Sequence, residues 1–109
     1  MKGIKKVQLF TKEIEKKIPR EVNTEENGRV YVKWFHPFHF WKWYGMTYDP
    51  EDGIFFGYVH GDFPEFGSWA LDELEGIRVM TLPVERDLYW DDKTTIDKVV
   101  KASQDGYPL

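Results

Sequence analysis

Cysteine is absent from the sequence, and so is any long apolar run. Without thiols the chain cannot form disulfides, thiolate zinc sites or iron–sulfur clusters, and it has no cysteine nucleophile. No segment approaches the roughly 20 consecutive apolar residues of a membrane-spanning helix. The lysines in MKGIKKVQLFTKEIEKK are not followed by the continuous apolar stretch of a secretory signal. We therefore expect a cytoplasmic protein that does not enter a membrane.

Hydroxyl nucleophiles and phosphate-binding loops are scarce as well. The only serines are Ser68 and Ser103, and neither stands in the strand–turn–helix elbow of a serine hydrolase. The segment GIFFGYVHG belongs to an expected strand, whereas a phosphate loop opens a helix. Acidic residues are plentiful from 49 to 92, but abundance alone does not define an acid–base pair. The sequence thus names no catalytic residue, and an enzyme is the less favoured interpretation.

A length of 109 residues fits one domain, so residues 1–109 are expected to form a single domain.

Charge is distributed unevenly along the chain. The net charge is −4, but residues 1–48 carry +5 and residues 49–92 carry −10. Either this asymmetry marks a bipolar surface or the two parts interleave in space and neutralise each other. In a domain this small we favour interleaving.

Helices are expected near both ends of the chain. Thr11 is a plausible N-cap for a short helix over 11–18, in which every fourth residue is apolar, and Pro19 ends it. Thr94 is expected to cap a second helix from about 95 to 102. A turn or two of helix is also expected at 71–76, after a short strand at 67–70.

Between these helices the sequence predicts strands at 30–35, 41–48 and 54–60. The connector DPEDG makes the last two a hairpin, in which Tyr44 faces Tyr58, Gly45 faces Gly57, Met46 faces Phe56 and Tyr48 faces Ile54. Phe56 then lies at the centre of the core. The opposed glycines leave a hollow that a ring such as Trp43, or a helix, should fill. The expected fold is α+β: a small twisted antiparallel sheet built around this central hairpin and packed by N- and C-terminal helices.

Aromatic residues concentrate between residues 34 and 48, which hold eight of the nineteen in the chain. His36 and His39 lie in the same stretch, in HPFH. Because Pro37 favours an extended backbone, the two rings should point apart, as surface or loop histidines do. We therefore expect no metal site and no cofactor.

The entrance of the predicted hairpin is the best candidate for a binding surface. Trp41 lies where strand pairing runs out, next to Phe38 and Phe40, and His60 should lie opposite Lys42 near the same aromatics. We predict binding residues Phe38, Phe40, Trp41 and His60 unless the N-terminal helix covers them. Aromatics with lysines are also typical of single-stranded nucleic-acid sites. The acidic chain disfavours this, and a protein partner is preferred over nucleic acid.

The segment LPVERDLYW sets three charged residues between apolar neighbours. If it is extended, Glu85 and Asp87 share one face and Arg86 takes the other. Arg86 is expected to pin the strand by pairing with an acid elsewhere, and an exposed charged hot spot is the alternative.

YVKWF, FFGYV, WALDEL and above all LPVERDLYW resemble the bacterial family catalogued as domain of unknown function 2958. The resemblance extends from TKEIEKKIP to Trp90, although Trp69 stands where Phe or Tyr would be expected. It implies small cytoplasmic bacterial proteins, often encoded on plasmids and other mobile elements, with no known activity and no catalytic residues. The sequence therefore favours a non-enzymatic interaction module associated with mobile elements. The alternative is a small enzyme with a histidine and carboxylate site in an aromatic-lined pocket around His60.

Overall fold

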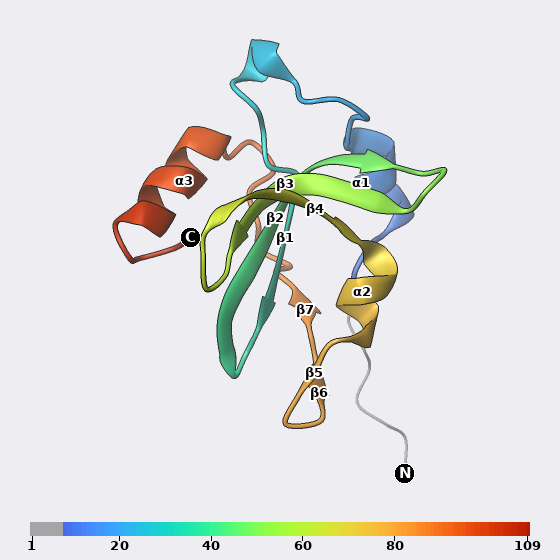
Figure 1. The fold of residues 1–109 in the computed structure, drawn as a ribbon. Helices are drawn as coiled ribbons and strands as arrows, with labels where there is room; N and C mark the ends of the chain where they lie inside the picture. Colours follow the sequence, from blue (N-terminus) through green and yellow to red (C-terminus); the bar gives the residue numbers. More distant parts are fainter. Residues whose placement is uncertain (1–7) are drawn as a thin grey trace.

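A five-stranded antiparallel sheet forms the centre of the computed structural model, which describes residues 8–109 (Figure 1). Its strand order is β4-β3-β2-β1-β7, and β5 and β6 form a separate two-stranded ribbon. The strands are β1 (Val32–His36), β2 (His39–Asp49), β3 (Ile54–His60), β4 (Glu65–Ala70), β5 (Arg78–Val79), β6 (Leu82–Pro83) and β7 (Glu85–Arg86). The helices are α1 (Lys12–Lys17), α2 (Leu71–Gly76) and α3 (Ile96–Gln104), with a short 3-10 helix η1 (Thr24–Glu26). The predicted α+β class is confirmed, with helices from both ends of the chain against an antiparallel sheet.

The N-terminal helix begins at its predicted cap, whereas α3 begins one residue later than predicted. The Thr11 hydroxyl accepts a hydrogen bond from the Ile14 amide at 3.2 Å, so α1 begins at the predicted cap. In α3 the N-cap is Thr95 rather than the predicted Thr94, and its side chain makes no capping hydrogen bond. Thr94 instead accepts a main-chain hydrogen bond from Val30 at 2.8 Å, which ties the entry of α3 to the sheet.

The register of the central hairpin agrees with the prediction over half of its length. Tyr44 pairs with Tyr58 and Gly45 with Gly57, as expected. Beyond Gly45 the pairing shifts by one residue, because β2 carries an irregularity at Met46. Phe55 is fully buried as a result, whereas Phe56 is only half-buried. The prediction that Phe56 is the central core residue is therefore wrong.

Each face of the sheet carries its own apolar cluster, because side chains alternate along the strands. On one face the rings of Trp34 and Trp69 pack against Phe55, beneath α1 and α2. The other face, which packs against Val99 of α3, contributes Val30, Tyr44, Met46 and Tyr58. Figure 1 shows α3 on one side of the strands and α1 with α2 on the other. Trp34 and Trp69, rather than Trp43, fill the space above the opposed glycines.

Oppositely charged parts of the chain interleave, as favoured from the sequence. Lys33 pairs with Asp87, and both Lys17 and Arg29 pair with Asp92, each at 3.5 Å. Each of these ion pairs joins the basic first part of the chain to the acidic middle.

Within residues 8–109, no helix has the length and apolar character to cross a membrane.

Candidate functional site

The β1–β2 hairpin ends in a tight turn at Pro37 and Phe38. His36 and His39 form the last strand pair before it, so HPFH is not the extended stretch predicted from Pro37. Proline is compatible with this turn because its fixed φ suits the first central position. His39 is exposed as expected, but His36 is only 4% exposed, so the prediction of a surface histidine is wrong there.

His36 uses both ring nitrogens to hold the end of this hairpin in place. Its Nδ1 accepts a hydrogen bond from the Phe38 amide at 3.0 Å. The proton of the neutral ring therefore sits on Nε2, which donates to the main-chain oxygen of Leu82 at 2.9 Å. This second hydrogen bond ties the β1–β2 turn to the β5–β6 ribbon.

The β5–β6 ribbon turns through two residues in left-handed conformations, Met80 with φ 52° and Thr81 with φ 68°. The type I′ hairpin turn has positive φ at both central positions, and Asn-Gly is its preferred sequence. A β-branched threonine is strained in this region, at roughly 1–2 kcal/mol. The chain thus holds an apolar Met80, which is 75% exposed, on a strained turn.

Four large apolar side chains are exposed on these two neighbouring hairpins. Their exposed fractions are 59% for Phe38, 51% for Phe40, 75% for Met80 and 39% for Leu82. We call these four residues the hairpin-end surface. Phe38 and Phe40 stand out in the sequence because of their aromatic surroundings. Met80 and Leu82 were not predicted, and the one signal for them in the sequence is the segment VMTL, in which three of four residues are apolar.

The four residues predicted to bind do not form one patch. Trp41 is half-buried on the face of the sheet with Trp43, and its Nε1 donates to the Asp62 carboxylate at 3.1 Å. Phe40 and His60 share the opposite face, with their ring centroids 6.3 Å apart. Phe38 lies in the β1–β2 turn, two residues before Phe40. The structure thus brings Phe40 and His60 together and leaves Trp41 on the other side of β2.

His60 joins the sheet to α3. The Tyr58 hydroxyl donates to Ser103 Oγ at 3.2 Å, and Ser103 Oγ shares a second hydrogen bond of 2.5 Å with His60 Nδ1. Burial lowers the pKa of His60 below its usual range, and the nearby Lys42 ammonium lowers it further. Since Ser103 is only 5% exposed, its hydroxyl is enclosed between strand and helix. This arrangement suits a structural link better than a nucleophile.

Lys42 places a positive charge beside the hairpin-end surface. Its ammonium donates to the main-chain oxygen of Phe40 at 3.4 Å. Burial lowers the pKa of Lys42, and the positive charge of Lys33 adds to the effect. Lys33 pairs with Asp87, but across residues 8–109 no carboxylate forms an ion pair with Lys42.

Among residues 8–109, no three or more His, Asp or Glu side chains are grouped so as to hold a metal ion.

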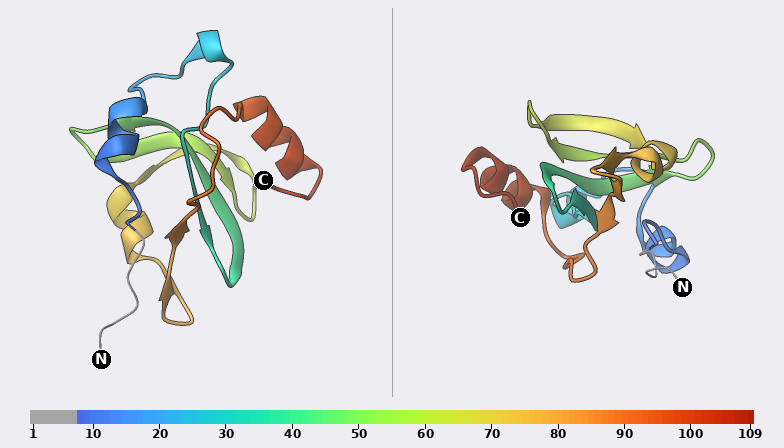
Figure 2. Two further views of the ribbon diagram at one scale, coloured as in Figure 1. Left: turned by 180° about the vertical axis from the view of Figure 1, so that it is seen from behind. Right: turned by 90° about the horizontal axis from the view of Figure 1, so that it is seen from below.

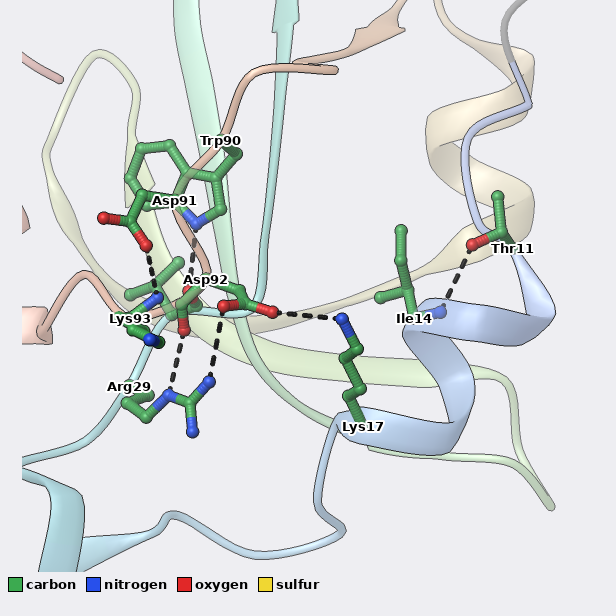
Figure 3. Close-up of polar contacts among 9 residues, drawn as sticks. Thr11, Ile14, Lys17, Arg29, Trp90, Asp91, Asp92 and Lys93 are labelled. Atoms are coloured by element: carbon green, nitrogen blue, oxygen red, sulfur yellow. Dashed lines mark hydrogen bonds and ion pairs between the residues drawn. The ribbon is translucent and has the colours of Figure 1, made fainter.

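A cleft of about 160 Å³ lies between α1 and the segment 86–92, and the sequence did not reveal it. Seen from behind in Figure 2, α1 faces the chain that descends from α3 to β7. Figure 3 shows Lys17 reaching from α1 to Asp92, which also holds Arg29. The cleft is lined by Glu13, Ile14, Lys17, Tyr31, Val32, Arg86, Asp87, Leu88, Trp90 and Asp92. Half of these lining residues lie in the charged motif LPVERDLYW or, in the case of Asp92, just after it.

Sequence comparison identifies a family and no individual relative. No curated protein and no solved structure matches the chain. One family model does, described as "Protein of unknown function (DUF2958)", and it matches residues 7–107. This match takes in the hairpin-end surface, the cleft and all three helices, and it agrees with the resemblance noted in the sequence motifs. The chain belongs to the DUF2958 family of proteins of unknown function.

Proposed function

We propose that the protein is a non-enzymatic interaction module that binds a protein partner through the hairpin-end surface. One observation carries this proposal: four large apolar side chains are exposed on two hairpins that the hydrogen bond from His36 to Leu82 joins. Exposed apolar patches typically mark interfaces, and buried aromatic anchors supply much of the binding energy in protein complexes. Trp41 and His60 are proposed to border this surface, because Trp41 follows Phe40 on β2 and the His60 ring lies near the Phe40 ring from β3.

The chemistry around the surface indicates what the partner should carry. Phe38 and Phe40 call for apolar side chains on the partner. Lys42, which has no carboxylate partner within residues 8–109, calls for an acidic side chain nearby. A protein segment can offer both groups together. A nucleic acid would have to overcome the net charge of −4, because phosphate contacts supply most non-specific affinity.

The strained β5–β6 turn also supports a recognition role. Backbone strain in a folded protein tends to be kept where function requires the geometry. Here the strain at Met80 and Thr81 holds an apolar side chain out toward solvent, where it adds nothing to the core.

The surroundings of His60 support a module over an enzyme. An enzyme built on this histidine would need carboxylates around it in a deep pocket. The ring instead contacts Ser103 and Phe40, and the charged group that acts on its pKa is the cation of Lys42. These neighbours suit a shallow aromatic surface with a positive edge.

We further propose that this module acts in the bacterial cytoplasm and serves plasmids or other mobile elements. The support for this setting is the character of the family that the motifs resemble. Partner capture should therefore use a lysate from a bacterium that carries such an element.

The experiment compares three tagged versions of the full chain in that lysate, with and without nuclease. They are the parent, the double variant Phe38→Ser/Phe40→Ser, and the control Tyr107→Ser. Tyr107 is 84% exposed and lies after α3, outside both hairpins, so it matches the exposed aromatic character of the replaced residues. Circular dichroism should confirm that all three fold alike.

We expect a protein that the parent and Tyr107→Ser capture equally and that the double variant loses, with nuclease having no effect. Losing two central aromatic contacts at about 2 kcal/mol each would weaken binding about a thousandfold. Equal capture by the double variant would refute the hairpin-end surface. Loss of capture on nuclease treatment would show a nucleic-acid partner and refute the proposed protein partner.

A further inference from the structure

The cleft between α1 and the segment 86–92 is distinct from the hairpin-end surface, and the proposed module does not use it. Its apolar wall is made by side chains from three elements of the fold, among them Ile14, Val32 and Leu88. Its volume of about 160 Å³ is close to that of a cavity known to hold one benzene-sized group. The cleft therefore has room for one amino-acid side chain or a ligand of similar size.

The acidic side chains at its edge are already neutralised, with one exception. Asp87 pairs with Lys33, and Asp92 pairs with Lys17 and with Arg29, as Figure 3 shows for Asp92. Glu13, on the exposed side of α1, forms no ion pair within residues 8–109. A ligand in the cleft would thus meet one available carboxylate at the rim.

Arg86 lines the cleft with a guanidinium that is hydrogen-bonded through one of its three nitrogens within the described residues. Its Nε donates to the main-chain oxygen of Gln8 at 2.8 Å, which fixes the plane of the guanidinium. Within the described part of the chain, neither terminal nitrogen has a hydrogen-bond or ion-pair partner, so the expected pairing of Arg86 with an acid is wrong. An anchored guanidinium with two open nitrogens is arranged to grip a carboxylate by two parallel hydrogen bonds.

We propose that this cleft binds the carboxylate end of a single amino-acid residue, with the carboxylate on Arg86 and the side chain against Ile14, Val32 and Leu88. The residue is either a free amino acid or the C-terminal residue of a peptide. A free amino acid also carries an ammonium group, which Glu13 at the rim can accept. The motif LPVERDLYW thereby has a role as one wall of a binding site.

Three probes separate these possibilities on the full chain. L-Leucine has both charged ends, N-acetyl-L-leucine keeps only the carboxylate, and L-leucinamide keeps only the ammonium. Each is titrated into isotope-labelled protein while the Arg86 Nε–Hε resonance and the amides of the cleft are followed by NMR. Arg86→Lys keeps the charge but loses the two parallel N–H donors of the guanidinium. Lys98→Gln on the exposed side of α3 serves as the control.

We expect saturable shifts centred on the cleft with both carboxylate probes, weakened at least about tenfold in Arg86→Lys and unchanged in Lys98→Gln. Tighter binding of leucine identifies a free amino acid, and tighter binding of N-acetyl-leucine identifies a peptide C-terminus. Each of these outcomes supports the site.

Equal binding of leucinamide, no saturable shift with either carboxylate, or unchanged binding in Arg86→Lys would overturn the proposal. The probe comparison remains decisive even if Arg86→Lys folds poorly. The double variant Phe38→Ser/Phe40→Ser should bind the probes as the parent does, so failure of the hairpin-end surface and failure of the cleft can be told apart.

Discussion

Replacing Gly57 with alanine tests the packing of the central sheet at a single atom. A Cβ at this position would overlap the main-chain oxygen of Tyr44 and lie 2.9 Å from its carbonyl carbon and 3.1 Å from the Trp69 ring. The oxygen belongs to the neighbouring strand, so the overlap can be relieved only by moving backbone. Gly67 is the partner of Gly57 on β4, and a Cβ there meets nothing within 4 Å. The two glycines therefore face each other across β3 and the edge strand β4, but only a Cβ at Gly57 meets neighbouring atoms.

We expect Gly57→Ala to lower the free energy of unfolding by more than about 3 kcal/mol, the upper end of ordinary overpacking, because backbone must shift. A domain of this size has a total stability of about 5–15 kcal/mol. With a urea dependence of about 1.5 kcal/mol per molar, the midpoint should fall by about 2 M. Gly67→Ala should leave it within about 0.5 M, since alanine also restricts the unfolded chain. Tryptophan fluorescence during urea unfolding measures both midpoints. A Gly57→Ala midpoint within 0.5 M of the parent, as a rough limit, would refute the close approach of β2 and β3 described above.

Three further predictions concern the core, a histidine and the strained turn. Phe55→Ala should destabilise the fold by about 3–5 kcal/mol and Phe56→Ala by clearly less, because Phe55 is fully buried and Phe56 half-buried. Urea midpoints measure both losses, and equal losses would contradict the shifted register. The fold lowers the pKa of His60, so its stabilising effect should be complete above the ordinary value of 6.5 and lost as pH falls through the lowered pKa. The stability difference between the parent and His60→Gln should therefore shrink in acid, and a difference that grows would reverse the assigned direction. Met80→Asn combined with Thr81→Gly should raise the melting temperature, since this pair suits positive φ at both positions, and a lowered one would mean that the turn is not strained.

Much of the sheet can be predicted from the sequence because local pattern and turn chemistry agree there. Tyr44 pairs with Tyr58 and Gly45 with Gly57 as predicted, but beside the connector DPEDG it is Asp49, not Tyr48, that pairs with Ile54, and the extra residue Met46 in β2 restores the predicted register. The shift at Met46 could not be predicted, because both faces of this hairpin are apolar. A one-residue slip then moves apolar side chains onto another apolar face, so the pattern does not discriminate between the registers.

The functional surfaces were harder to predict because they depend on contacts between distant segments. Phe38 and Phe40 could be singled out from the aromatic stretch that contains them. Met80 joins them only through the β5–β6 turn, which lacks the Asn-Gly sequence that marks such turns. The cleft brings α1 against a segment some 75 residues away, as the pair of Lys17 and Asp92 illustrates. No periodicity or motif in a single sequence reports a contact of that range.

The central claim is that the hairpin-end surface binds a protein partner, and one dissociation constant tests it most directly. Once the captured partner is purified, its affinity is measured by calorimetry for the parent, for Phe38→Ser/Phe40→Ser and for Tyr107→Ser. The account predicts that the double variant binds at least about a hundredfold more weakly, whereas Tyr107→Ser binds as the parent does. Equal affinity for all three proteins would contradict it.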